Sequence, residues 1–250
     1  MHKAHEIVNA SGRPWGLLVC DHAANDIPAE LGTLGLDPSM LEEHIAWDIG
    51  AAELVRGLST ALNLPAVLSR HSRLVVDCNR RLDEPSAFPA VTDRVVVPGN
   101  QSLDPAARQW RADRCYWPYH AAIRDRLDTA RRAGATPALV SVHSFTPRMD
   151  GFVRPWHVGV LWDFDDRIAT PLLAALRDRE GLVVGDNQPY SGRHPANHTV
   201  HVHAASVGLP HVGIEVRQDL LGNQAGVAGW VEILHDALAP IIAGLVSSAV

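Results

Sequence analysis

Lysine and cysteine are scarce in this 250-residue chain, and both scarcities narrow what the protein can be. Lys3 is the only lysine, and 28 acidic residues outnumber 22 basic ones, giving a formal net charge of −6. We therefore expect no basic surface for a nucleic acid. Cys20, Cys78 and Cys115 are too few and too scattered for a disulfide framework, and they include no CxxC pair. This cysteine usage predicts a reducing, cytoplasmic location.

Long apolar runs and several common catalytic motifs are also missing. No segment approaches the roughly 20 uninterrupted apolar residues that span a bilayer, so no membrane partner is expected. Residues 1–12 lack the apolar core of a signal peptide. The chain has no GxSxG elbow, no GxxxxGK phosphate loop and no GxGxxG dinucleotide loop. With 250 residues, 46% of them hydrophobic, the chain can bury a substantial core without disulfides, and we expect a single catalytic domain over 1–250.

Short apolar runs alternate with helical patterns along the chain, which indicates an α/β fold. Strands are expected at 15–20, 66–68, 138–142, 157–162, 182–184 and 211–216, and helices at 38–62, 104–133, 166–180 and 225–245. Two turn-rich stretches, 80–101 and 186–197, are expected to be functional loops. Alternating strands and helices predict a single-domain, three-layer α/β/α architecture with a mostly parallel mixed sheet.

Polar side chains stand at the ends of several expected strands. His22 and His143 each follow a strand directly, and Glu215 closes another. Ligands of open α/β sheets gather where parallel strands end, so these side chains are expected to converge. Two imidazoles with one carboxylate form the donor set of a catalytic zinc ion, which leaves a position for water. We therefore expect one Zn²⁺ per chain.

The third metal ligand is open on the sequence alone. Asn25 lies three residues after His22, but a neutral amide is a poor zinc ligand, whereas Asp48 would supply a carboxylate. On a helix, His44 and Asp48 would share one face, so His44 could bind the metal or orient Asp48. The alternative for each histidine is a hydrogen-bonded structural role, and for the His44 and Asp48 pair a helix-surface contact.

Candidate substrate-binding groups lie at the start of the first loop. Asn79 and Arg80 suit bidentate recognition of a carboxylate, although a strand-end cap with solvated arginines gives the same pattern. Arg70 and Arg73 precede them and could polarise a scissile carbonyl or bind negative charge. The segment therefore predicts either an anchor for an acidic substrate or a polar cap.

Glu215 is a candidate general base. A carboxylate that ends an apolar run is costly to bury unless it is paired or functional, and beside a metal it can accept a proton from water. Its structural alternative is a salt bridge to Arg217 or another arginine. Cys20 and His22 could be imagined as a nucleophile pair, but a small buried core residue is favoured for Cys20. A further group of histidines matches no metal motif and predicts a surface helix or loop: His194, His198, His201 and His203.

Seven short segments, taken together and in order, resemble the N-formylglutamate amidohydrolase family. They are CDHAAN at 20–25, DIGA at 48–51, DCNR at 77–80, YWPYH at 116–120, VHSFTP at 142–147, PYSG at 189–192 and EVRQDL at 215–220. The resemblance extends over about residues 15–245. It implies a zinc-dependent hydrolase with a fold similar to zinc carboxypeptidases, which converts N-formyl-L-glutamate to formate and glutamate.

The more distant similarity to zinc carboxypeptidases implies a role for each matching position. The positions are His22, Asn25 and His143 for the metal, Arg70 or Arg73 for the carbonyl, Asn79 and Arg80 for the substrate carboxylate, and Tyr190 and Glu215 for substrate binding and catalysis. Arg217, two residues after Glu215, joins the substrate-binding candidates. Asn25 stands where those enzymes have a glutamate, which keeps Asp48 in the ligand set.

Two alternatives remain beside an N-formylglutamate hydrolase. One is a hydrolase of a different N-acyl amino acid or of a peptide, because changes in pocket side chains redirect the same metal chemistry. The other is a metal-free protein that binds a carboxylate without catalysis, motivated by the amide at Asn25. The sequence does not distinguish among oligomeric states.

Overall fold

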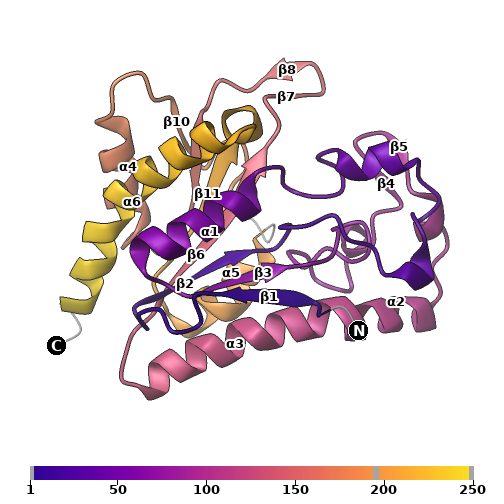
Figure 1. Cartoon of the computed structure of the whole chain (residues 1–250), viewed down its shortest axis with the longest axis horizontal. Coiled ribbons are helices and arrows are strands. Elements are labelled where there is room, and N and C mark those ends of the chain that lie inside the picture. The colour runs from indigo at the N-terminus through magenta and orange to yellow at the C-terminus, as the bar shows by residue number, and fades with distance from the viewer. Residues whose placement is uncertain (1–2, 194–196, 248–250) are drawn as a thin grey trace.

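The computed structural model describes residues 3–193 and 197–247, and its centre is a seven-stranded sheet (Figure 1). The strands of this sheet are β1 His5–Val8, β2 Gly16–Cys20, β3 Ala66–Ser69, β6 Ala138–Phe145, β9 Val158–Leu161, β10 Val184–Asp186 and β11 His211–Arg217. Their order is β1-β3-β2-β6-β11-β9-β10. The β1/β3 and β11/β9 pairs are antiparallel and the other neighbours are parallel, which confirms the mostly parallel mixed sheet.

Helices cover both faces of the sheet. They are α1 Ala51–Leu62, α2 Pro105–Arg111, α3 Trp117–Arg132, α4 Ala169–Arg177, α5 His198–His203 and α6 Gln224–Ser247. Helices α1, α4 and α6 lie on one face and α3 and α5 on the other (Figure 1). Along β2, Leu18 and Cys20 enter the core under α1 and α6, whereas Leu17 and Val19 enter the core under α3. This alternation is that of a strand buried on both faces, and it confirms the three-layer α/β/α fold.

Helix α6 is, within the described part of the chain, the one helix long and apolar enough to cross a membrane by length and composition. Its buried residues Trp230, Leu234 and Leu238 belong to the core, and the helix packs against α1 and α4. The apolar residues of α6 therefore contribute to the core on this face of the sheet.

The helix expected over 38–62 is wrong in its first half. A short 3-10 helix covers Pro38–Glu42, residues 43–50 form turns, and α1 begins only after Gly50. Gly50 has a φ of +80°, a left-handed conformation that glycine adopts without steric cost, and it lies against Leu221. A Cβ at this position would lie 2.5 Å from the Cβ of Leu221, so the chain turns here instead of continuing a helix.

Other elements follow the sequence more closely. The pattern over 104–133 forms α2 and α3, joined by a π-helical turn at Ala112–Tyr116, and Gly134 follows with a φ of +82°. Strand β6 extends to Phe145, so His143 lies within a strand and not after it. The edge strand β1 was not predicted, and neither were two short hairpins: β4 Val91–Thr92 with β5 Val95–Val96, and β7 Arg148–Met149 with β8 Phe152–Val153.

Candidate active site

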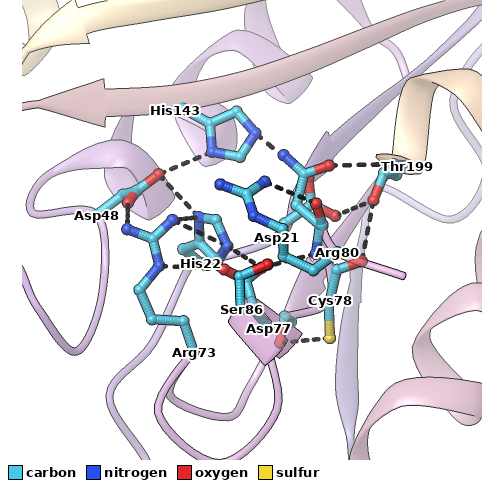
Figure 2. A network of polar contacts seen from close by, with 12 residues as sticks. Asp21, His22, Asp48, Arg73, Asp77, Cys78, Arg80, Ser86, His143 and Thr199 are labelled. Carbon is cyan, nitrogen blue, oxygen red and sulfur yellow. Dashed lines mark hydrogen bonds and ion pairs between the residues drawn. The ribbon is translucent and has the colours of Figure 1, made fainter. Parts of the chain in front are cut away.

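Three buried side chains meet at the end of the central strands. His22, Asp48 and His143 each offer a ligand atom, and these atoms all lie within 4.8 Å of one another. Asp48 Oδ2 lies 3.3 Å from His22 Nδ1 and 2.8 Å from His143 Nδ1 (Figure 2). His22 lies two residues beyond the end of β2, and His143 lies on the parallel neighbour β6. The sheet therefore brings the two histidines to the same edge.

Asp48 reaches this edge from an irregular segment that is held by backbone hydrogen bonds. Its own N–H donates to the carbonyl of His22 at 2.9 Å, and the N–H of Arg73 donates to the carbonyl of Ala46 at 3.1 Å. These bonds join residues that are distant in sequence, and they fix the 43–50 turns between the end of β2 and the segment around Arg73.

The two other candidates for the third metal position lie elsewhere. His44 and Asp48 do not share a helix face, because residues 43–50 form turns, and His44 Nε2 instead lies 3.1 Å from Asp93 Oδ2. Asn25 Nδ2 donates to the carbonyl of Leu41 at 2.9 Å, because the turn after β2 carries Asn25 away from the two histidines. Among the three, only Asp48 joins the cluster.

A second carboxylate lies behind each histidine. His22 Nε2 is 2.7 Å from Asp77 Oδ1, and His143 Nε2 is 3.2 Å from Asp21 Oδ2. Both rings therefore turn their Nδ1 atoms toward Asp48. Histidines that bind metals nearly always donate their other ring N–H to such a carboxylate or carbonyl. The donor set thus fits a divalent cation. Asp21 and Asp77 were not predicted from the sequence, although each lies within two residues of a predicted site residue.

The carboxylates and histidines of the cluster shift one another's pKa. Burial alone would raise the pKa of Asp21, but the hydrogen bond and charge of His143 bring this pKa down to about 2. Burial would lower the pKa of His143, yet its contacts with Asp21 and Asp48 raise that pKa well above the usual value. The carboxylates near both ring nitrogens of His143 therefore favour positive charge at this place.

Glu215 lies beside this cluster on β11, in register with His143 of β6. Its side chain is buried, and Oε2 has no hydrogen-bond partner within the described residues. Burial raises the pKa of Glu215 to about 7, with the charge of His143 lowering it and that of Asp48 raising it. The alternative salt bridge to Arg217 is not formed, because Arg217 pairs with Asp219 at 2.8 Å.

Of the two arginines proposed for the carbonyl, the structure brings only Arg73 to the cluster. Arg73 Nη1 lies 3.4 Å from Asp48 Oδ1, and Nη2 lies 2.5 Å from His22 Nδ1 and 3.0 Å from His22 Nε2. Arg70 is exposed and faces Asp26 at 3.6 Å, outside the cavity described next. The local backbone separates the two side chains, because Arg70 follows the end of β3 and Arg73 lies in the turns beyond it.

A cavity of about 630 Å³ opens over the cluster. Its lining includes the cluster itself, the predicted Arg73, Asn79, Arg80, Tyr190 and Glu215, and an apolar wall of Pro85, Pro89, Ala90, Val91, Met149 and Leu161. Both turn-rich stretches that were expected to be functional loops contribute residues to this lining. Asn25, Arg70 and Arg217 do not line the cavity.

The structure also shows the surroundings of Cys20 and of the later histidine group. Cys20 is fully buried, and this burial raises the pKa of its thiol well above the usual value, which excludes an activated nucleophile. Three residues of the later histidine group, His198, His201 and His203, lie on α5. His203 is buried, and its Nε2 lies 2.8 Å from His120 Nδ1, so the expectation of a surface group is wrong for this residue. His194 lies outside the described residues.

A protein-family model and solved structures match most or all of the chain. The family model for N-formylglutamate amidohydrolase matches residues 16–221. A gene product of Agrobacterium tumefaciens has 37% sequence identity and a TM-score of 0.94, covering 98% of this chain and 96% of that one. An N-formylglutamate amidohydrolase from Ralstonia eutropha has 20% identity and a TM-score of 0.71, with 100% of each chain covered. The comparison with curated proteins gives no match.

Proposed function

The chain belongs to the N-formylglutamate amidohydrolase family of amide hydrolases, and we propose that it hydrolyses N-formyl-L-glutamate to formate and L-glutamate with the help of one zinc ion. The observation that carries this proposal is the His22, Asp48 and His143 cluster beside the buried, unpartnered oxygen of Glu215. The three buried cysteines are free, which supports the cytoplasmic location that we propose with this function.

Zinc is the ion that this donor set favours. Two imidazole nitrogens and one carboxylate oxygen are the ligands of many catalytic zinc sites, and they leave one position open. Asp77 and Asp21 behind the two histidines would fix the ring orientations. When bound, zinc would act as a Lewis acid that polarises the scissile carbonyl and lowers the pKa of water in the cavity.

Glu215 would act as the general base and then as the general acid. It takes a proton from the attacking water, and it returns that proton to the amide nitrogen as the carbon–nitrogen bond breaks. A carboxyl group with a pKa of about 7 can do both near neutral pH. Arg73, held in place by Asp48, would stabilise the negative charge that develops on the carbonyl oxygen.

Asn79 and Arg80 would anchor the substrate carboxylate at the far side of the cluster. The amide oxygen of Asn79 already accepts a hydrogen bond from the N–H of Thr199 at 3.1 Å, so its Nδ2 is left to donate. Arg80 Nη1 donates to the carbonyl of Asn79 at 2.9 Å, and the guanidinium lines the cavity as a positively charged donor for the substrate carboxylate. Tyr190, on the second loop, would close the substrate in from another side of the cavity.

The apolar wall of the cavity favours a second candidate substrate class. Pro85, Pro89, Val91 and Met149 offer no partner for a charged group, and they would suit an N-acyl amino acid with a larger apolar acyl group. The metal-free binding protein loses its motivation, because Asp48 offers the carboxylate that Asn25 does not.

A panel of substrates tests these alternatives. We expect the zinc-loaded protein to hydrolyse N-formyl-L-glutamate with a higher kcat/KM than N-acetyl-L-glutamate, N-formyl-L-leucine or N-octanoyl-L-glutamate. A preference of about tenfold or more for the octanoyl compound would favour the second class, since one methylene in a pocket is worth about 1–3 kcal/mol. Absence of hydrolysis across the panel would contradict the proposed function.

A further inference from the structure

The carboxylate behind His143 is held by two buried hydroxyl groups. Tyr119 Oη, from α3, donates to Asp21 Oδ1 at 2.9 Å, and Thr199 Oγ1, from α5, donates to the same oxygen at 2.5 Å. The other oxygen, Oδ2, lies at ion-pair distance from His143 Nε2, at 3.2 Å, as Figure 2 shows for Asp21, Thr199 and His143. Ser141 Oγ lies 3.1 Å from the same nitrogen. The side chains thus form a chain of contacts from two helices to one candidate ligand of the metal.

This arrangement fixes the orientation of the Asp21 carboxylate. With both donors on one oxygen, a tilt of the carboxylate plane would lengthen two hydrogen bonds, so the other oxygen stays directed at His143. Tyr119 and Thr199 are both fully buried, and water cannot replace their hydroxyl groups. We propose that Tyr119 and Thr199 are positioning residues, which hold Asp21 against His143 and thereby keep His143 Nδ1 directed at the metal. This inference rests on the zinc site of the proposed function.

Thr199 also contacts Asn79 through its backbone. Its N–H donates to Asn79 Oδ1, the candidate substrate anchor, whereas its hydroxyl reaches Asp21 and, at 3.3 Å, the carbonyl of Cys78. A change of the Thr199 side chain therefore removes the contact with Asp21 and leaves the backbone donor to Asn79 in place. Such a change should therefore weaken metal binding and leave the KM for the substrate nearly unchanged.

A matched control is available elsewhere in the core. Ser59 of α1 is fully buried, and its hydroxyl donates to the carbonyl of Leu64 at 2.6 Å. Its removal breaks a buried hydrogen bond, as the removal of the Tyr119 or Thr199 hydroxyl does, but far from the cluster. Ser59→Ala therefore reports the effect of a buried hydroxyl on the fold alone.

The experiment is a zinc titration of the metal-free, full-length protein in competition with a chromophoric chelator. Asp21→Asn should weaken zinc binding by roughly 10- to 100-fold, the usual loss when a partner of a ligating histidine is changed. Tyr119→Phe and Thr199→Val should each produce part of this loss, and the double variant should approach Asp21→Asn. Thr199→Ser, which keeps the hydroxyl, should bind zinc as the wild type does, and so should Ser59→Ala. The KM of zinc-saturated Thr199→Val should stay close to that of the wild type.

Two results would overturn the positioning roles. One is wild-type zinc affinity in both Tyr119→Phe and Thr199→Val, with only thermal stability reduced. The other is an equal loss of affinity in Ser59→Ala. If Thr199→Val does not fold, the affinity of Tyr119→Phe decides alone. A wild-type protein that binds no zinc would refute the proposed function itself. A wild type that binds zinc no more tightly than Tyr119→Phe and Thr199→Val would refute only the positioning roles.

Discussion

At the scale of single residues, Glu215 is a buried carboxylate whose Oε2 has no hydrogen-bond partner among the described residues. A buried carboxylate with an unpartnered oxygen destabilises the fold, and burial raises its pKa to about 7. Such a residue is explained by chemistry that needs a proton acceptor at neutral pH. Its position beside His143 on the neighbouring strand places that acceptor next to the candidate metal ligands.

Replacing Glu215 by glutamine should separate catalysis from metal binding. The Glu215→Gln variant keeps the shape of the side chain but cannot accept the proton, so we expect kcat to fall by about 100-fold or more while zinc binding is retained. Glu53→Gln, an exposed change on α1, should leave kcat unchanged. The measurements are steady-state kinetics and zinc content, and a Glu215→Gln variant with wild-type kcat would remove Glu215 from the mechanism.

The raised pKa of Glu215 also predicts a pH dependence. Because its carboxyl group stays protonated up to about pH 7, the base is present above this pH and is lost as the pH falls. We expect kcat/KM to decrease about tenfold per pH unit below pH 7. The residual activity of Glu215→Gln should lack this acidic limb. A kcat/KM that is flat between pH 5 and pH 7 in the wild type would contradict the assignment.

Sequence reasoning found most of the residues in the site but not their supports. His22, His143, Asn79, Arg80 and Glu215 stand at or near strand ends, where a pattern of apolar and polar residues is visible without a structure. The hydroxyls of Tyr119 and Thr199 come from helices on the α3 and α5 face, and no local pattern shows that they meet Asp21. Such contacts depend on how the helices pack across the sheet.

At the scale of elements, the second loop packs closely on the strand opposite Glu215. Gly159 of β9 pairs in register with Glu215 of β11. A Cβ at Gly159 would lie 2.0 Å from the carbonyl oxygen of Gln188, in the loop that carries Tyr190. The glycine therefore permits a backbone approach that positions one wall of the cavity.

The variant Gly159→Ala should move this loop and leave the metal cluster in place. We expect a loss of about 1–3 kcal/mol in the free energy of unfolding from overpacking, and a higher KM because Tyr190 is displaced. Zinc affinity should be unchanged. Gly229→Ala on α6, where a Cβ would meet no neighbour within 4 Å, is the control. Chemical denaturation and steady-state kinetics provide the measurements, and unchanged stability and KM in Gly159→Ala would show that the loop position does not depend on this glycine.

The elements that the sequence predicted are those with a continuous apolar pattern. The β2, β6 and β11 runs are buried along almost their whole length, and α3 and α6 bury part of their apolar residues. The 38–62 segment also has a helical pattern, but the left-handed Gly50 against Leu221 and the bonds that hold Asp48 near His22 override it. The structure that brings Asp48 to the metal site is therefore set by long-range contacts, which a local pattern does not contain.

At the scale of the whole molecule, the order of the sheet assembles the site. Strands β2, β6 and β11 are parallel neighbours, so segments almost 200 residues apart in sequence end at the same edge. The turns around Asp48 and the two loops line the cavity at this edge. The central claim is that this edge holds one zinc ion on His22, Asp48 and His143, and that the ion is needed for amide hydrolysis.

The most direct test is to measure zinc content and N-formyl-L-glutamate hydrolysis together, in the wild type and in Asp48→Asn and Asn25→Ala variants, before and after treatment with a chelator. We predict about one zinc per chain in the wild type and in Asn25→Ala, with hydrolysis that chelation abolishes and added zinc restores. Asp48→Asn should lose both zinc and hydrolysis. Hydrolysis by the metal-free wild type, or zinc and hydrolysis retained in Asp48→Asn but lost in Asn25→Ala, would contradict the account.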